Sequence, residues 1–416
     1  MNEPLTSSEV SRRKFLACGM GGLAFFAADF PGRSYGQEGP MKSGSTTVIL
    51  GGGFGGIVTA RRLREALPDP HRVVLIEKKP DFAIGVTKTW VMLGQAEAEK
   101  VSYSLDRLKR KQIEVRRAEV KRIDVSSRTV STSDGDIRAD YLVIALGADL
   151  SMGRVPGLEK AAQTFYTMDG AVRLRDKLKA FDGGEVVLLV PRVPFKCPPA
   201  PYEGAMLLHA YFQEHGLGER TRLHVYTAEK MPMATAGPEI GSYIKGELEK
   251  RGIGYHPMRK AESADADRKT VMFEDGGSIR YDLLIAIPPH EAPAAVRESG
   301  LTNQAGWVPV DPKTMELVTE HEPHRVYSIG DVASVALPGR FQPDVPLVLP
   351  KAGVFAERQG DVVAKAIAAH VLGGESADRF DGKGFCYIES GKGQAFRGVE
   401  LRRRDLDAIL ATEQDD

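Results

Sequence analysis

The stretch Thr46-Thr47-Val48-Ile49-Leu50-Gly51-Gly52-Gly53-Phe54-Gly55-Gly56 decides the fold. Its apolar half predicts a buried strand that ends at the glycines, and the pattern over residues 57–67 predicts a helix directly after them. A second apolar run, residues 72–76, predicts the next strand. A strand, a glycine-rich turn, a helix and a strand make a βαβ unit, so the sequence indicates a parallel sheet.

The glycines of this turn have the G-x-G-x-x-G spacing of dinucleotide-binding folds. The first glycine permits the tight turn, the second lets a pyrophosphate approach the backbone, and the third lets helix and strand pack closely. A carboxylate ends the second strand, where it can accept hydrogen bonds from ribose hydroxyls. The predicted contacts to a bound dinucleotide are Gly51, Gly53, Phe54, Gly55, Gly56 and Glu77.

The same beginning recurs near residue 185. Residues 185–190 and 222–226 read as strands, with a helical pattern over 202–214 between them. The predicted fold class is therefore α/β, with two tandem Rossmann-like dinucleotide-binding folds of the FAD/NAD(P)-binding kind and a small C-terminal region. The turn of the second fold has no glycine and five prolines, which lack the N–H groups of a phosphate cradle, so NADH is disfavoured there.

The N-terminus predicts export. Adjacent Arg12 and Arg13 precede an apolar run over 15–28, which is shorter than the ~20 residues that cross a bilayer. We interpret residues 1–36 as a twin-arginine signal peptide that directs the protein to the periplasm. Of the three cysteines, Cys18 falls inside this signal, which leaves Cys197 and Cys386 as a candidate pair in an oxidising compartment.

Two further segments resemble motifs of the glutathione-reductase-like flavoproteins with two dinucleotide-binding domains. Residues 141–148 resemble the middle motif and end at Gly147-Ala148, and residues 327–332 resemble the second flavin motif, with Gly330 and Asp331. The resemblance implies FAD, with the aspartate on the ribityl chain. It divides the chain into an FAD-binding domain (45–150 and 300–349), a second Rossmann-like domain without a nucleotide fingerprint (151–299) and a C-terminal redox and interface region (350–416).

The loop of the second fold resembles that of the sulfide:quinone oxidoreductase and flavocytochrome c sulfide dehydrogenase family. It carries Cys197, prolines and then Tyr202-Glu203, and the stretch that begins at Cys386 resembles the family's second redox cysteine segment. Lys351 lies in a segment that resembles the helix start beneath the flavin. The resemblance implies a flavin-dependent enzyme that oxidises sulfide or a related sulfur compound through a Cys197–Cys386 redox disulfide.

Roles and alternatives follow from this resemblance. Glu203 is the candidate acid/base or a carboxylate that favours the helix dipole. Lys351 stabilises reduced flavin or is an ordinary solvated lysine, and the two cysteines are redox-active or form a structural disulfide. Residues 81–85 lack the cysteine that attaches FAD in flavocytochrome members, so FAD is expected to be non-covalent.

The electron acceptor stays open between a quinone and a c-type cytochrome. No Cys-x-x-Cys-His is present, and the C-terminal residues include Arg402-Arg403-Arg404, which indicates at most peripheral membrane contact. No metal site is predicted. A net charge of zero gives no reason to expect nucleic acid. The alternative functions are an NADH-linked flavin reductase, similar to type II NADH dehydrogenases, and a non-catalytic flavoprotein subunit of an electron-transfer complex.

Overall fold

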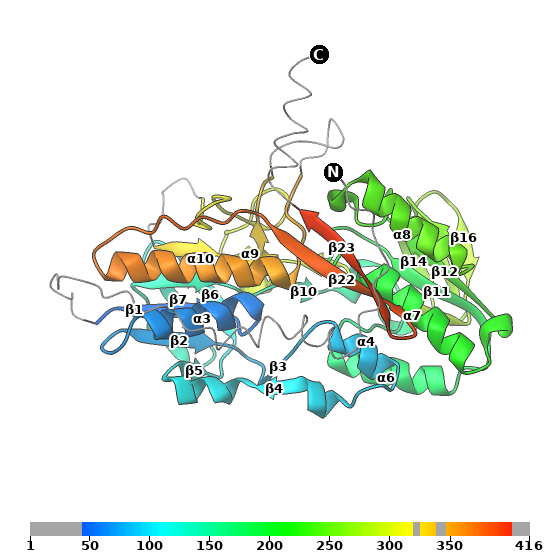
Figure 1. The fold of residues 1–416 in the computed structure, drawn as a ribbon, viewed down its shortest axis with the longest axis horizontal. Coiled ribbons are helices and arrows are strands. Elements are labelled where there is room, and N and C mark those ends of the chain that lie inside the picture. The colour runs from blue at the N-terminus through cyan, green and yellow to red at the C-terminus, as the bar shows by residue number, and fades with distance from the viewer. Residues whose placement is uncertain (1–43, 319–324, 338–346, 402–416) are drawn as a thin grey trace, which may run out of the picture.

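The computed structural model describes residues 44–318, 325–337 and 347–401, so the predicted signal peptide and Arg402–Arg404 lie outside the described residues. Two parallel sheets lie next to each other along the long axis (Figure 1). The strands of the first sheet are β1 (Thr46–Leu50), β2 (Arg72–Ile76), β5 (Glu114–Arg116), β9 (Tyr141–Ile144) and β20 (Val326–Ser328). Their order is β20-β9-β1-β2-β5, and every neighbouring pair is parallel, which confirms the predicted fold class for this half.

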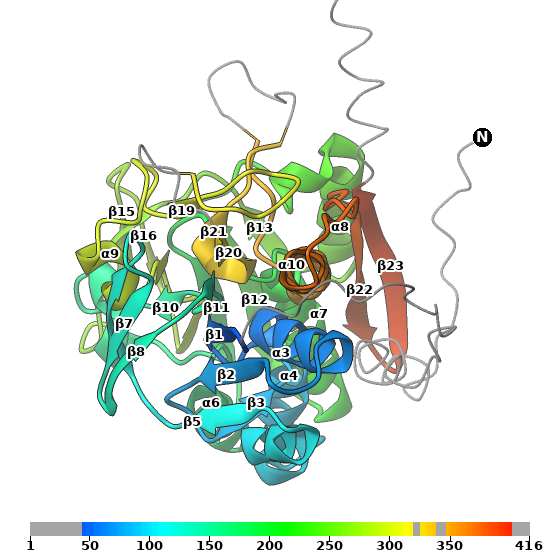
Figure 2. The same ribbon diagram turned by 90° about the vertical axis from the view of Figure 1, so that its left-hand side faces the viewer.

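Helix α3 (Phe54–Ala66) follows β1 and begins three residues earlier than the sequence pattern predicts. Its first turn contains glycines because the backbone passes very close to its neighbours there. A Cβ atom at Gly56 would lie 1.9 Å from the carbonyl oxygen of Gly51. Helix α10 (Gly353–Val371) packs directly against α3, and a Cβ atom at Gly360 would lie 2.7 Å from the carbonyl oxygen of Gly55 (Figure 2).

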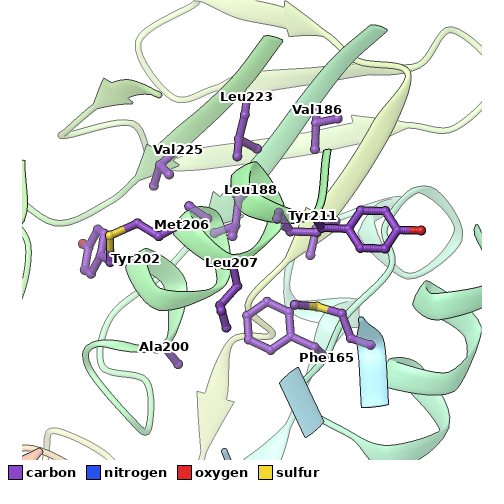
Figure 3. Close-up of a cluster of buried hydrophobic side chains, with 14 of the residues drawn as sticks. Phe165, Val186, Leu188, Ala200, Tyr202, Met206, Leu207, Tyr211, Leu223 and Val225 are labelled. Carbon is purple, nitrogen blue, oxygen red and sulfur yellow. The ribbon is translucent and has the colours of Figure 1, made fainter. Parts of the chain in front are cut away.

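The second sheet repeats the first one. Its strands are β11 (Gly184–Val190), β12 (Thr221–Thr227), β13 (Gly254–His256) and β17 (Leu283–Ala286), all parallel in the order β13-β12-β11-β17. The helices of this half are α6 (Met168–Lys179), α7 (Ala200–Glu214) and α8 (Pro238–Lys250). Helix α7 packs against β11 and β12, and its Met206 lies in one buried cluster with Leu188 and Val225 (Figure 3). The tandem arrangement is confirmed.

Smaller elements complete the two halves. Antiparallel sheets are formed by β3 (Asp81–Ala83) with β4 (Ser102–Ser104), by β6 (Val120–Asp124), β7 (Thr129–Thr132) and β8 (Gly135–Arg138), and by β14 (Ala261–Asp265), β15 (Thr270–Phe273) and β16 (Ser278–Arg280). The chain passes between the halves through β10 (Asp149–Leu150) and β18 (His290–Glu291), which pair antiparallel. Helix α4 (Thr87–Met92) belongs to the first half by sequence, but its Val91 and Met92 join the core of the second half.

A two-stranded hairpin closes the C-terminal region. Strands β22 (Gly384–Gly391) and β23 (Gln394–Leu401) pair antiparallel, and the hairpin passes from the end of α10 to α7 (Figure 1). Ile388 and Phe396 from this hairpin enter the same core as α7. The hairpin therefore positions Cys386 over the second Rossmann-like half. Within the residues that the structure describes, no helix is both long and apolar enough to cross a membrane.

Candidate active site

Cys197 lies in the loop between β11 and α7, where the first half has its glycine turn. Its φ of 57° falls in the left-handed region, which is unusual for a residue with a side chain. The Cys197 N–H donates to the carbonyl oxygen of Lys351 at 2.6 Å, and its own carbonyl accepts from the Ala200 N–H at 2.9 Å. The strained cysteine is therefore held both by the start of α7 and by the segment that leads into α10.

Cys386 lies on β22, and both cysteines are part-buried free thiols. Burial raises the pKa of Cys197 well above its ordinary value, and the charge of Cys386 raises it further. Burial, followed by the charge of Glu203, raises the pKa of Cys386 to about 11. The structure thus brings two thiols that are distant in the chain within range of each other's charge, and the predicted disulfide between them stays a prediction.

Glu203 lies in the first turn of α7 and is only 2% exposed, so it is not a solvated carboxylate at a helix N-terminus. One of its carboxylate oxygens accepts the backbone N–H of Glu389 at 2.9 Å. Burial raises the pKa of Glu203 to about 8, the Glu389 N–H opposes this shift, and the Glu389 charge adds to it. A carboxyl group that titrates near neutral pH beside two thiols is suited to accept and return a proton.

Two residues at this site were not predicted from the sequence. Glu389 is 4% exposed, and its carboxylate accepts the indole N–H of Trp90 at 2.7 Å. Trp90 lies on α4, almost 300 residues away along the chain. Contacts over such a separation leave no periodic signal in the sequence, so sequence motifs do not reveal them.

Lys351 is buried, which excludes the alternative of an ordinary solvated lysine. Its ammonium group lies 3.4 Å from the centroid of the Trp307 ring and donates a hydrogen bond to the carbonyl oxygen of Asp331. Burial lowers its pKa to about 8, and the charge of Asp331 opposes this. A small hollow between Gly330 and α10 has Lys351 in its wall. The cation is therefore placed beside the residues expected at the flavin.

Further lysines surround Cys197. Lys196 precedes it, and Lys88 lies on α4. Burial lowers the pKa of both, that of Lys88 to about 8, and each senses the charge of Cys197. The Tyr166 hydroxyl donates to the carbonyl oxygen of Lys196 at 2.9 Å and so fixes the loop. Burial also lowers the pKa of His290 to about 3, which keeps this ring neutral beside the lysines.

The first glycine turn fits a dinucleotide. Gly51 has a φ of 106° and lies tightly against Ala145, whereas a Cβ atom at Gly53 would meet nothing within 4 Å. This open space lies at the N-terminus of α3, where a pyrophosphate could approach. Both oxygens of Glu77 are oriented by backbone N–H groups, one from Gly52 at 2.8 Å and one from Lys79 at 2.9 Å. The turn therefore has both the space and the carboxylate that the motif requires.

The remaining predicted flavin contacts lie at the edge of the same sheet. Gly147 and Gly330 have φ values of 71° and 74°, and the Gly330 N–H donates to the side chain of Gln359 at 2.7 Å. Asp331 follows directly, and burial raises its pKa, with the charges of Lys196 and Lys351 opposing the shift. When bound, a flavin would supply two-electron redox chemistry at this edge.

The second fold has closed its own nucleotide site. Glu229 follows β12, as Glu77 follows β2, but its carboxylate accepts the hydroxyl hydrogen bond of Tyr202 from α7. Tyr202 is fully buried. The Glu229 carboxylate, which a ribose hydroxyl would need as its acceptor, thus already accepts a hydrogen bond from an internal tyrosine. This contact disfavours NADH binding in the second fold. Among the described residues, no three His, Cys, Asp or Glu side chains gather as a metal site would require.

Comparisons with known proteins agree with this architecture. Residues 45–190 match the family of pyridine nucleotide-disulphide oxidoreductases, and residues 171–288 match the central region of the sulfide dehydrogenase (flavocytochrome c) flavoprotein chain. The mitochondrial sulfide:quinone oxidoreductase of Mus musculus is 24% identical over 308 residues, which are 69% of this chain and 65%, slightly under two thirds, of the mouse protein. The sulfide-quinone reductase of Aquifex aeolicus is 26% identical over 334 residues, which are 77% of this chain and 75% of that protein.

The fold comparison points the same way. The crystal structure of the sulfide:quinone oxidoreductase from Aquifex aeolicus superposes with a TM-score of 0.74 at 23% identity, and the match covers 88% of this chain and 89% of that one. The two family models, which together run from the first glycine turn to β17, and the sulfide:quinone oxidoreductase relatives imply a flavin cofactor. These matches support the family that the sequence resembles, the sulfide:quinone oxidoreductases and flavocytochrome c sulfide dehydrogenases, which are flavoproteins with two dinucleotide-binding domains.

Proposed function

We propose that this protein is an FAD-dependent oxidoreductase that oxidises sulfide, or a related sulfur compound, at Cys197 and Cys386. One observation carries the proposal: two part-buried thiols from the loop after β11 and from β22 share one site with a buried carboxyl group, Glu203. A cysteine stands where a nucleotide-binding fold needs glycine, which favours redox chemistry over nucleotide binding at this edge of the second sheet.

The first step uses the oxidised form, in which Cys197 and Cys386 form a disulfide. A hydrosulfide anion attacks one of its sulfur atoms, so one S–S bond breaks and a new one forms. The products are a persulfide on one cysteine and a thiolate on the other. When the disulfide forms again, sulfur leaves at the zero-valent level, and a bound flavin would supply the acceptor for the two electrons and the proton of hydrosulfide.

The surroundings of the thiols assist these steps. Both thiols have raised pKa values, so either sulfur is a poor leaving group as a thiolate. A nearby acid that protonates the departing sulfur makes its departure easier. The pKa of about 8 lets Glu203 hold a proton at neutral pH and release it with little cost. We assign Glu203 the role of the acid/base and Lys351 that of the cation beside the flavin.

A quinone is the acceptor that we propose first, because the relatives that match two thirds or more of this chain include three named for sulfide and quinone and one named for NADH and quinone. A c-type cytochrome is the second candidate, supported by the match of residues 171–288 to a flavocytochrome flavoprotein chain.

We further propose that FAD is held without a covalent bond and that residues 1–36 direct export to the periplasm. Ala83 and Ile84 stand in the segment where flavocytochrome members carry their attaching cysteine.

Anaerobic titration of the purified flavoprotein tests the proposal. Sulfide is expected to bleach the flavin absorbance in wild type, and Cys197→Ser or Cys386→Ser should slow this reduction by at least ~10³-fold, since each removes one partner of the disulfide. Ser278→Ala, an exposed substitution on β16, is the control. Equal bleaching by NADH and sulfide would favour the reductase alternative. Unchanged turnover of an assembled complex that contains Cys197→Ser would favour the relay subunit instead.

Reoxidation then distinguishes the acceptors. After reduction by sulfide, a short-chain quinone or oxidised cytochrome c is added in separate anaerobic mixes. The quinone is expected to restore the flavin absorbance faster. A faster reaction with cytochrome c at matched concentration would move the assignment to the second candidate.

A further inference from the structure

We propose that Glu389 is a positioning residue for the acid/base: it links α4, β22 and α7 through hydrogen bonds and decides in which pH range Glu203 exchanges its proton. Nothing in the sequence motifs assigns a role to this residue. The inference rests on the proposed function of Glu203, but its principal test does not depend on turnover or on sulfide.

The contacts of Glu389 form a chain across three elements. Its backbone N–H donates to one oxygen of Glu203 at 2.9 Å, and its carboxylate accepts from the Trp90 indole at 2.7 Å. Glu389 lies three residues after Cys386 on β22 and pairs with Ala395 on β23. One residue of the hairpin thus fixes the orientation of Glu203 and is itself anchored to α4.

The two carboxyl groups are buried together. Glu203 is 2% exposed and Glu389 is 4% exposed. Within the described residues, neither of them forms an ion pair with a lysine, arginine or histidine. Two carboxylates that share a site without a cation do not both ionise readily, so one of them keeps its proton to higher pH.

The hydrogen-bond donors to the two carboxyl groups differ. A hydrogen bond from Trp90 stabilises the ionised form of Glu389, whereas Glu203 receives only the backbone N–H of Glu389. The negative charge of Glu389 then raises the pKa of Glu203. The other titratable groups that interact with Glu203 are Cys386 on β22, Cys197 in the loop and Tyr166 before α6, and all three are protonated below their raised pKa values.

The same contacts could serve only to anchor the hairpin, and two variants separate the possibilities. Glu389→Gln keeps an oxygen that accepts from Trp90 and keeps the backbone N–H, but it removes the charge. Glu389→Asp keeps the charge but is one methylene too short for the same hydrogen bond with Trp90. A purely structural anchor would therefore tolerate the glutamine and suffer from the aspartate.

The experiment is an infrared pH titration of the reduced holoenzyme, following the C=O stretch of protonated buried carboxyl groups. Wild type should show a band that is lost near pH 8, and Glu203→Gln should lack this band, which assigns it. In Glu389→Gln the band should disappear at a pH lower by about one unit or more, equal to a tenfold or larger change in proton affinity. Glu389→Asp should titrate closer to wild type than to Glu389→Gln.

The inference is overturned if the Glu203 band titrates at the same pH in Glu389→Gln and wild type while circular dichroism and tryptophan fluorescence show an intact fold. It is also overturned if only Glu389→Asp moves the band. The pH profile of flavin reduction by sulfide gives the second readout, in which Glu389→Gln should move the limb assigned to Glu203 in the same direction. A correct infrared shift without any reduction by sulfide would contradict the proposed function and leave the positioning role intact.

Discussion

At the scale of single residues, Lys351 shows how burial and function are connected. A buried ammonium group is unfavourable unless something compensates for the lost water. Here the Trp307 ring and the Asp331 carbonyl do so in part, and the pKa of about 8 shows that the compensation is incomplete. In the role that we propose for Lys351, its charged form would gain a full partner when negative charge develops on a reduced flavin, and the lysine would favour the reduced state.

Replacing Lys351 by methionine tests this argument. The flavin reduction potential of Lys351→Met should fall by ~30 mV or more, which corresponds to ~1.4 kcal/mol for a two-electron couple, because the reduced form loses a cation. Spectroelectrochemical titration measures the potential directly. Lys313→Met, which removes an exposed lysine, serves as the control. Equal potentials in Lys351→Met and wild type would show that the cation does not act on the flavin.

At the scale of elements, the glycine turn before α3 separates a structural glycine from a cofactor glycine. A Cβ atom at Gly56 would lie 1.9 Å from the Gly51 carbonyl oxygen, and both groups are backbone, so neither can move away easily. A Cβ atom at Gly53 meets nothing within 4 Å, and its φ of −85° suits any residue. The same substitution should therefore have different consequences at the two positions.

We expect Gly56→Ala to destabilise the protein by ~2–3 kcal/mol and to release flavin, because the turn must open. Gly53→Ala should leave the apoprotein as stable as wild type and should weaken flavin binding at least about tenfold, since the methyl group fills the space for the pyrophosphate. Urea unfolding of the apoprotein and fluorescence titration with FAD measure the two effects. Loss of apoprotein stability in Gly53→Ala, or tight flavin binding in both variants, would contradict this division.

The elements also show what the sequence could predict. Both βαβ units were predictable because strand and helix periods are local, and the loop around Cys197 was recognisable because prolines replace glycines there. The start of α3 was placed three residues late, since glycines inside a first turn hide the helical pattern. The hairpin contacts were not predictable, because Glu389 meets residues 186 and 299 positions away. Their partners depend on tertiary packing alone.

At the scale of the whole molecule, buried titratable groups set the pH range in which the protein is stable. Burial raises the pKa of Glu203 to about 8 and that of Glu229 to about 7, so above pH 4.5 the folded state binds protons that the unfolded state releases. Stability from these groups is complete below about pH 4.5 and declines as the pH rises towards 7–8. Burial lowers the pKa of His71 to about 4 and of His290 to about 3, and these groups act in the opposite direction below pH 6.5.

The loss of stability as the pH rises towards 7–8 can be tested at Glu229, which lies outside the proposed active site. Glu229→Gln keeps an oxygen to accept the Tyr202 hydroxyl but cannot ionise. Between pH 5 and pH 8 the wild type should lose up to ~2 kcal/mol more stability than this variant, after allowance for the partial exposure of Glu229. Urea midpoints at several pH values measure the difference, and Glu375→Gln on the surface should follow wild type throughout. Because the histidines are unchanged, the acid limb should coincide in all three proteins. A Glu229→Gln curve parallel to wild type up to pH 8 would mean that this carboxyl group ionises in the fold as easily as in the unfolded chain.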